Sequence, residues 1–210
     1  MKILLIGPPA CGKGTVGELL SEKLGFPVIS IGGLLREIPE THPRYSELHT
    51  LMDSGELAPH DLVAEVLKKR LEDADCARGF LLDGYLRNIV QLEHFDPRVD
   101  VALFIDIEPE TSIKRISGRR ICEADDFTCN IFTMSEEDPH NCKRCSGELT
   151  QRADDAEEVV RERLEVYAEE TLPVVDHYKK LGILRKIDGE GTPEEVFELA
   201  LAALKNSDSN

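Results

Sequence analysis

Positive charge and long apolar runs are both scarce in this chain of 210 residues. Lysine and arginine together number 25 against 41 aspartates and glutamates, which gives a net charge of −16. Such an acidic surface repels nucleic acids and anionic membranes, so neither is expected as a partner. No apolar stretch approaches the roughly 20 residues of a membrane span, and the apolar start is too short for a secretory signal core. We therefore expect a cytoplasmic protein whose six cysteines stay reduced.

The first 15 residues, MKILLIGPPACGKGT, carry the strongest functional signal. Lys2–Ile6 indicates a short buried strand, and the apolar spacing from Lys13 onward indicates a helix, so a glycine-rich loop joins the two. In this geometry backbone N–H groups and the positive end of the helix dipole converge on one point, which favours a bound phosphate. The spacing of Gly7, Gly12 and Lys13 matches the P-loop, and the hydroxyl residue Thr15 comes one place later than in the usual motif.

Short apolar runs alternate with helical patterns along the rest of the chain. The predicted strands are Lys2–Ile6, Pro27–Ile29, Phe80–Asp83, Val101–Ile105 and Leu184–Ile187. The predicted helices are Lys13–Leu24, Asp61–Glu72, Ile89–Glu93, Pro109–Ser117, Ala156–Glu170 and Pro193–Leu204. This alternation predicts an α/β fold with a five-stranded parallel sheet flanked by helices, and ligands at the carboxyl ends of the strands. Two stretches break the rhythm and indicate insertions: residues 30–59, which are mostly helical, and residues 121–151, which are rich in cysteine and acidic residues.

The order of the motifs resembles the adenylate kinases. Along the chain come GPPACGKGT, ISIGGLLRE, MDSGELAPHDLV, LLDGYLRNIVQ, SGRRIC, a cysteine-bearing insert, QRADD and RERL, so the resemblance covers nearly the whole chain. In that family a P-loop core, expected here at residues 1–29, 60–120 and 152–210, carries two mobile inserts. Residues 30–59 would then bind the acceptor nucleoside monophosphate, and residues 121–151 would form a lid that closes over ATP.

The resemblance also implies roles for single residues. Phosphoryl transfer mainly needs alignment and charge neutralisation, which suits arginine because its planar fork binds phosphate oxygens and stays charged. The residues expected at the transferring group are Lys13, Asp83, Arg87, Arg119, Arg152 and Arg163, with Asp83 ordering magnesium through water. The ATP-binding residues would be Gly7, Ala10, Cys11, Gly12, Lys13, Gly14, Thr15, Arg115, Arg119 and Gly189, with Arg115 against the adenine. The acceptor AMP would contact Ile31, Arg36, Glu56, Leu57, Ala58, Gly84, Arg87, Gln91, Arg152 and Arg163, with Gln91 reading the base.

A group of cysteines in the second insert predicts a metal site. Cys122, Asp125, Cys142 and Cys145 have the paired short spacings that suit tetrahedral zinc, and they resemble the zinc-bearing lids of many bacterial adenylate kinases. The zinc would be structural, because four protein ligands leave no open position and a small insert with few large apolar residues needs such a staple. The alternatives for the fourth ligand are Asp126, Cys129 and His140. A lid of unliganded cysteines is the competing interpretation.

Several acceptor-side positions depart from the family pattern: Ile31 for Thr, Gly33 for Asp, Glu56 for Lys and Leu86 for Pro. The peptide before that proline is typically cis in the family, whereas a non-proline cis bond costs ~3 kcal/mol. We therefore expect a trans peptide between Tyr85 and Leu86, and a re-aimed Arg87. The donor side matches the pattern. Its Cys11 is either a small side chain tolerated in the phosphate loop or a thiol whose pKa the helix end lowers.

The sequence therefore predicts an adenylate kinase reaction, a Mg²⁺-dependent reversible transfer from ATP to AMP that yields two ADP, by a monomer with structural Zn²⁺. No catalytic base is required, and closure of both inserts would exclude water. The alternatives are a kinase for another nucleoside monophosphate and a nucleotide-binding sensor or assembly protein that retains the fold. Arg119, Arg152 and Arg163 argue against the sensor, because binding alone does not need a ring of arginines around the transferred group.

Overall fold

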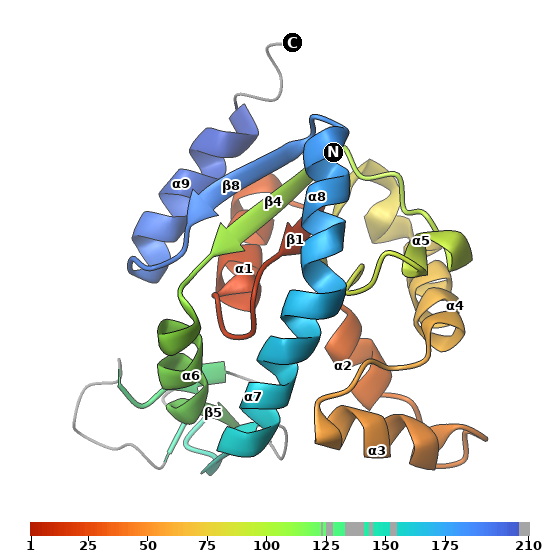
Figure 1. The fold of residues 1–210 in the computed structure, drawn as a ribbon, viewed down its shortest axis with the longest axis vertical. Helices are drawn as coiled ribbons and strands as arrows, with labels where there is room; N and C mark the ends of the chain where they lie inside the picture. Colours follow the sequence, from red (N-terminus) through yellow and green to blue (C-terminus); the bar gives the residue numbers. More distant parts are fainter. Residues whose placement is uncertain (123, 125–127, 133–140, 143–144, 152–154, 206–210) are drawn as a thin grey trace.

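A computed structural model of the chain describes residues 1–122, 124, 128–132, 141–142, 145–151 and 155–205. Its centre is a five-stranded sheet in the order β2-β3-β1-β4-β8 with every neighbouring pair parallel (Figure 1). The strands are β1 (Lys2–Ile6), β2 (Val28–Ser30), β3 (Phe80–Asp83), β4 (Val101–Asp106) and β8 (Leu184–Asp188). Each lies within one residue of its predicted bounds, so the parallel α/β sheet is confirmed.

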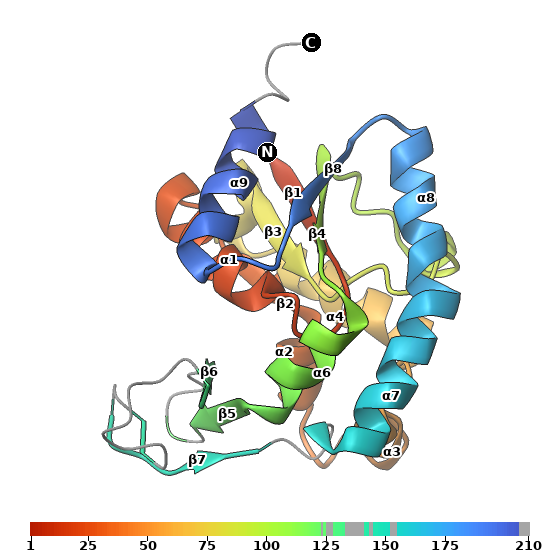
Figure 2. The same ribbon diagram turned by 60° about the vertical axis from the view of Figure 1, so that its left-hand side comes forward.

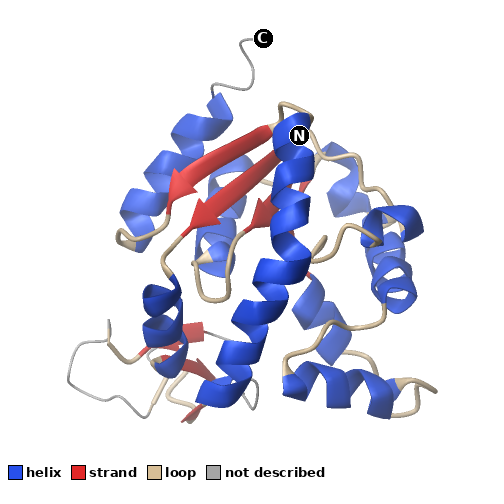
Figure 3. Cartoon of the chain, in the orientation of Figure 1, coloured by secondary structure: helices blue, strands red, loops and turns tan. Residues whose placement is uncertain are grey.

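Helices cover both faces of this sheet (Figures 2 and 3). Helices α1 (Lys13–Leu24) and α9 (Pro193–Lys205) lie on one face, and α4 (His60–Leu71) and α8 (Leu172–Lys180) lie on the other. The remaining helical elements are α2 (Ile31–Arg36), α3 (Tyr45–Ser54), the 3₁₀ turn η1 (Ala74–Arg78), α5 (Gln91–His94), α6 (Pro109–Ser117), α7 (Glu157–Val166) and the π-helical turn η3 (Tyr167–Thr171). The helices predicted at the start of the chain, at α4, at α6 and at α9 are confirmed with small changes at their ends.

The side chains of β1 show how the sheet divides the core. Successive residues of a strand point to opposite faces. Ile3 and Leu5 therefore pack with α1 and α9, whereas Leu4 and Ile6 pack with α4 and α8. All four are almost fully buried, as expected for a central parallel strand covered on both sides. The carboxyl end of this buried strand is a fixed point from which the phosphate loop starts.

The segment after α7 differs from the sequence prediction. One helix was expected to end at Glu170, but the chain continues through η3 into α8 without leaving a helical path (Figure 1). Pro173 favours an end at this point, because proline lacks the N–H that a helix interior needs. Here it occupies the first turn of α8, directly after the wide turn η3, in which the Leu172 N–H donates to the Tyr167 carbonyl oxygen.

The two insertions have different structures. Residues 30–59 hold α2 and α3, as the helical pattern predicted. Residues 121–151 contain most of an antiparallel sheet formed by β5 (Arg119–Cys122), β6 (Thr128–Asn130) and β7 (Leu149–Thr150), which lies below the main sheet in Figure 2. Among the described residues, no helix combines the length and the apolar character that a membrane crossing requires.

Candidate active site

The loop between β1 and α1 has the geometry of a phosphate site. Gly12 adopts a left-handed conformation, φ 97°, and turns the chain into the first turn of α1. Ala10 also has a positive φ of 57°, so the loop curls tightly ahead of the helix. The N–H groups of this first turn have no partner within the helix, and they point along the positive end of the helix dipole. An anion is therefore favoured at this end of α1.

Lys13 lies folded over this loop. Its Nζ donates hydrogen bonds to the carbonyl oxygens of Gly7, at 2.8 Å, and Pro8, at 3.0 Å. The two carbonyl oxygens that follow β1 thus hold the ammonium group beside the loop backbone. A phosphate bound at the start of α1 would lie within reach of this positive charge.

Two buried side chains, Cys11 of the loop and Ser112 of α6, lie on the inner side of the phosphate loop. Cys11 is 1% exposed, and burial raises the pKa of its thiol although the neighbouring Lys13 opposes that shift. The interpretation of Cys11 as an activated thiol is therefore wrong, because the loss of hydration outweighs the positive charges nearby. The Ser112 hydroxyl of α6 donates to the Pro9 carbonyl at 2.5 Å, and Ser112 is completely buried. Sequence reasoning missed this anchor, since a lone serine in a helix carries no signal.

Asp83 and Thr15 lie near the same helix start. Asp83 is the last residue of β3 and pairs in register with Leu5 of β1. A Cβ placed on Gly14 would lie 3.9 Å from Oδ2 of Asp83, so the carboxylate faces the first turn of α1. Thr15 is exposed in that turn. The sheet topology therefore places the Asp83 carboxylate beside the first turn of α1, which carries Thr15, and a magnesium ion between them stays a prediction.

Two of the predicted transfer arginines share one buried carboxylate. The side chain of Asp155 is fully buried and accepts a two-pronged contact from Arg119, with Nε 2.8 Å from Oδ2. Nη1 of Arg163, on α7, lies 3.6 Å from Oδ1 of the same residue. Both arginine side chains are largely buried, at 16% and 13% exposed. Asp155 was missed as a site residue although it stands in the QRADD motif; Arg152 lies outside the described residues.

The residues predicted to hold the adenine of ATP meet beyond the carboxyl ends of β4 and β8. Arg115 of α6 donates to the carbonyl oxygens of Glu190, at 3.2 Å, and Gly191, at 3.4 Å. Gly189 approaches β4 so closely that an added Cβ would meet Ile105 at 2.7 Å. A hollow of about 440 Å³ lies alongside, lined by Asp106, Ile107, Glu108, Lys186, Ile187, Asp188 and Glu190. The fold thus brings Arg115 and the Gly189 turn together from distant parts of the sequence.

The loop after β3 carries the predicted acceptor groups Gly84, Arg87 and Gln91. The described residues contain no cis peptide bond, so the trans peptide between Tyr85 and Leu86 is confirmed. The guanidinium of Arg87 lies over Gly84, where an added Cβ would be 3.1 Å from Nη2. Gln91 is 3% exposed, and its Oε1 accepts a hydrogen bond from the Arg87 N–H at 2.9 Å. One of the two lone pairs of Oε1 is thus engaged by the loop backbone, and the contact of this amide with a base stays a prediction.

The acceptor residues of the first insert are spread between core and surface. Ile31 and Ala58 are buried in the core that includes α4, while Arg36 is exposed at the end of α2 and donates to the Gly32 carbonyl at 3.0 Å. Glu56 is exposed and accepts from the Ser54 hydroxyl at 2.9 Å. Leu57, which lies between Glu56 and Ala58 in the sequence, is half-buried. The contacts of these side chains with an acceptor stay a prediction.

Three cysteines of the lid insert meet in one cluster. The Sγ atoms of Cys122, Cys142 and Cys145 lie within 4.8 Å of one another, from the end of β5 and a tight turn. In that turn the Cys142 N–H donates to the Gly147 carbonyl at 2.8 Å. An added Cβ on Gly147 would lie 3.1 Å from Sγ of Cys122 and 3.3 Å from Sγ of Cys145, so the turn forms a cradle around the thiols. Cys129 packs beside them; the other predicted fourth ligands, Asp125, Asp126 and His140, lie outside the described residues.

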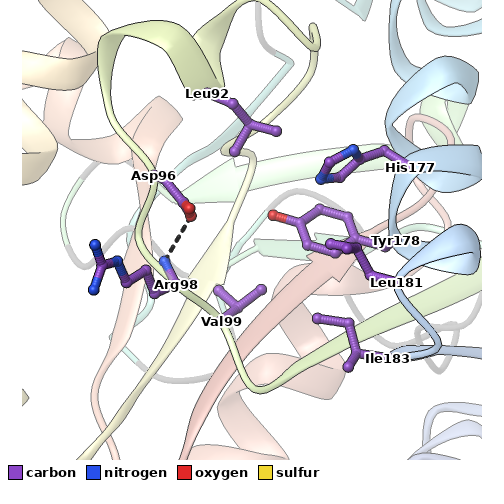
Figure 4. Close-up of a pocket in the computed structure, with 8 residues that line it drawn as sticks. All are labelled: Leu92, Asp96, Arg98, Val99, His177, Tyr178, Leu181 and Ile183. Atoms are coloured by element: carbon purple, nitrogen blue, oxygen red, sulfur yellow. Dashed lines mark hydrogen bonds between the residues drawn. The ribbon is translucent and has the colours of Figure 1, made fainter.

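A second hollow, of about 310 Å³, contains none of these groups (Figure 4). It is lined by Leu92, Asp96, Arg98, Val99, His177, Tyr178, Leu181 and Ile183. Val99 and Ile183 precede β4 and β8, so the hollow lies at the amino ends of the strands, opposite the phosphate loop. The Asp96 carboxylate faces into it while the Arg98 side chain points away, which makes it unsuited to a phosphate.

Comparisons with known proteins agree with this site. The family model described as adenylate kinase matches residues 5–183. The chain belongs to the adenylate kinase family. It is 39% identical to an adenylate kinase of Thermodesulfovibrio yellowstonii over 98% of this chain and 99% of that protein. It is 40% identical to an adenylate kinase of Clostridium tetani, over 94% and 95% of the two chains, and 39% identical to one of Streptomyces avermitilis over the full length of both.

Membership of the adenylate kinase family makes the chain an enzyme, a phosphotransferase of the nucleoside monophosphate kinase type. The fold agrees, because its P-loop, central sheet and two insertions occur in the order that the motifs predicted. The cysteine cluster adds a place that could hold a metal ion in the lid insert.

Proposed function

We propose that the chain catalyses the reversible reaction of ATP with AMP to give two ADP. One observation carries this proposal: the phosphate loop with Lys13 occurs in one chain with Arg119 and Arg163, which share the buried Asp155. The carboxylate fixes two largely buried arginines side by side, which suits the neutralisation of a phosphoryl group in transfer. The names of the family and of the relatives support the same reaction.

In the proposed reaction an oxygen of the AMP phosphate forms a bond to the γ-phosphorus of ATP. The bond between that phosphorus and the β–γ bridging oxygen breaks, and its electron pair stays on that oxygen, in the ADP that ATP leaves behind. Lys13 and the N–H groups of α1 would hold the donor phosphates, and Arg119, Arg152 and Arg163 would neutralise the group in transfer. The acceptor phosphate is negatively charged at neutral pH, so no residue has to act as a base.

The acceptor would lie against the loop after β3. Arg87 and Arg36 would bind its phosphate, because each carries a planar fork that matches phosphate oxygens. Gln91 would contact the base through Nε2 and the remaining lone pair of Oε1. Ile31, Glu56, Leu57, Ala58 and Gly84 complete the proposed acceptor site. Arg115 and the Gly189 turn would hold the adenine of ATP at the other end.

The proposed cofactors are Mg²⁺ with ATP and structural Zn²⁺. Magnesium would be ordered near Asp83 and Thr15, where it would neutralise phosphate charge. The three clustered thiols and the cradle at Gly147 suit zinc, because zinc prefers short-range tetrahedral sets of sulfur ligands. Asp125 is the proposed fourth ligand. Such a site would stabilise the small lid sheet, whose buried residues are few.

The proposed division of the chain follows the folding pattern. Residues 1–29, 60–120 and 152–210 would form the P-loop core, residues 30–59 the acceptor insert and residues 121–151 the lid. Closure of the two inserts over the nucleotides would exclude water and so prevent ATP hydrolysis. We further propose that the enzyme works as a monomer in the cytosol.

A coupled assay of Mg·ATP with AMP, CMP, UMP, GMP and dAMP tests this function, with ATP hydrolysis in the absence of acceptor as the control. Rapid ADP formation with AMP alone is the expected result. Preference for another base would favour a kinase for that nucleotide, for which the burial of Ile31 and the engaged Oε1 of Gln91 are the motivating observations. Tight ATP binding with no transfer to any acceptor would refute the kinase reaction.

A further inference from the structure

The loop that presents Arg87 has an unfavourable backbone path. Within four residues, Gly84 and Leu86 both adopt left-handed conformations, with φ of 79° and 53°. Glycine adopts this conformation freely, but leucine does so rarely, because its Cβ crowds the following carbonyl oxygen. Leu86 is moreover completely buried, so it cannot move toward solvent to relieve the crowding. Such a conformation persists only when the surrounding contacts determine it.

Side chains from two other elements hold both backbone polar groups of Arg87. Its N–H donates to Oε1 of Gln91, at the start of α5, at 2.9 Å. Its carbonyl oxygen accepts a hydrogen bond from the hydroxyl of Thr171, in η3, at 2.8 Å. Gln91 and Thr171 are 3% and 6% exposed, so both bonds are shielded from water. The position of the Arg87 backbone is thus set by two side chains from other elements, and not by the hydrogen bonds of a regular strand or helix.

The next residue repeats this link to η3. Nδ2 of Asn88 donates a hydrogen bond to Oε2 of Glu170, the neighbour of Thr171. Oδ1 of Asn88 accepts from the Val90 N–H at 2.7 Å, which fixes the orientation of the amide. A hydrogen bond to a charged carboxylate is stronger than one between neutral groups. Two adjacent residues of the loop after β3, Arg87 and Asn88, therefore form hydrogen bonds with two adjacent residues of the π-helical turn η3.

The turn η3 belongs to the same helical rod as Arg163. Helix α7 carries Arg163 and runs directly into η3, and α8 continues from it into the core (Figure 1). In the α7 part of this rod, Arg163 pairs with Asp155. In the α8 part, Val174 and Tyr178 are buried in the core. A π-helical turn widens the helix and changes which residues share a face, and it often occurs at functional sites. Here it presents Glu170 and Thr171 to the Arg87 loop.

We propose that Thr171, Glu170 and Asn88 are positioning residues for the acceptor phosphate. They hold Arg87 at a fixed place relative to Arg163, on the rod that carries it. This inference rests on the proposed function, in which Arg87 binds the phosphate of the acceptor. It predicts a selective effect: loss of the link raises the KM for the acceptor and leaves the KM for ATP nearly unchanged, because Lys13 and Arg115 are held by other elements.

A double-mutant cycle at Asn88 and Glu170 tests the link. Asn88→Asp places a carboxylate against Glu170 but keeps the oxygen that accepts from Val90, so the local turn survives. Glu170→Gln in the same chain restores one N–H donor between the two side chains with the direction reversed. We expect Asn88→Asp to raise the KM for AMP about tenfold and the double variant to recover most of that loss. Glu169→Gln, an identical change at an exposed neighbour in η3, is the matched control and should behave as wild type.

A second variant tests the link through Thr171. Thr171→Val keeps the shape of the side chain but removes the hydroxyl that donates to the Arg87 carbonyl, and Thr171→Ser restores a hydroxyl. We expect a KM for AMP raised about tenfold in the valine variant and largely rescued by serine, with the KM for ATP within twofold of wild type. Melting temperatures measured alongside separate this effect from general destabilisation, which would lower stability without splitting the two KM values.

The outcomes separate the inference from the function on which it rests. All variants are assayed with the acceptor that the wild type phosphorylates fastest. Additive effects at Asn88 and Glu170, or equal changes in the KM of ATP and acceptor, overturn the positioning role while leaving the kinase reaction intact. A wild-type enzyme that phosphorylates none of the acceptors overturns the function itself.

Discussion

The close approach of the acceptor insert to α7 gives the sharpest test of the site geometry. Gly55 ends α3 with φ 83°, and an added Cβ would lie 2.8 Å from Cγ of Arg163 and 3.0 Å from Cγ1 of Val159. Cγ is near the root of the arginine side chain, so the clash cannot be relieved by moving the guanidinium alone. Gly55→Ala should therefore shift Arg163 or push α3 away from α7.

The expected losses of stability and of kcat in Gly55→Ala are estimated by comparison with Gly182→Ala. Gly182 has a similar φ of 76°, and nothing lies within 4 Å of an added Cβ. Both variants incur the cost of a left-handed alanine, about 1–2 kcal/mol, which lowers the melting temperature by roughly 2–8 °C in a chain of this size. Only Gly55→Ala adds the contact with Arg163. Since a displacement of about 1 Å in a positioning group can cost about 10²-fold in rate, we expect kcat to fall roughly 10- to 100-fold.

The assay is steady-state kinetics of ADP formation together with thermal melting of both variants. The reasoning requires that Gly182→Ala keep the wild-type kcat while its melting temperature falls. If kcat of Gly55→Ala stays within twofold of that of Gly182→Ala, the contact between the acceptor insert and Arg163 has no part in the reaction. A Gly55→Ala chain that melts far below Gly182→Ala would show that the clash is relieved by loosening the fold.

Three further predictions concern single side chains. Lys13→Ala should lower kcat about 10²–10³-fold with the melting temperature nearly unchanged; full activity would dismiss the phosphate loop as the donor site. Cys142→Ser should remove the metal and lower the melting temperature, and native mass spectrometry of freshly purified protein that finds no metal in the wild type would refute the zinc site. Burial raises the pKa of Cys11, so the unfolded thiol ionises first and the free energy of unfolding should fall as pH rises above the ordinary thiol pKa. Cys11→Ala should weaken that alkaline loss, and an unchanged dependence on pH would show that Cys11 does not cause it.

Regular elements were predictable where their residues repeat a simple pattern. The buried strands β1 and β3 match their predicted bounds, because short apolar runs ending at glycine or aspartate leave few alternatives. Helix α8 was missed, because Pro173 predicts an end and no local pattern announces a π-helical turn. The strands of the lid were missed too, since they are short and bury few apolar residues.

The sequence predicted the charged residues of the candidate site, but it did not predict the side chains that position them. Arg119 and Arg163 stand in motifs, but the carboxylate that joins them, Asp155, becomes evident only when β5 and α7 meet. The same holds for Thr171 and the Arg87 carbonyl, which are 84 residues apart. The re-aiming of Arg87 that Leu86 implied stays a prediction, although the positive φ of Leu86 shows an unusual local path.

The carboxylate shared by Arg119 and Arg163 also limits how this enzyme can evolve. Replacing Arg119 alone removes the two-pronged hydrogen-bond partner of the fully buried Asp155, and replacing Asp155 alone leaves two largely buried guanidinium groups without the carboxylate that they share. The loss of Arg119 or of Asp155 alone is therefore disfavoured for folding as well as for the proposed activity. We therefore expect relatives of this chain to keep or lose Arg119 and Asp155 together.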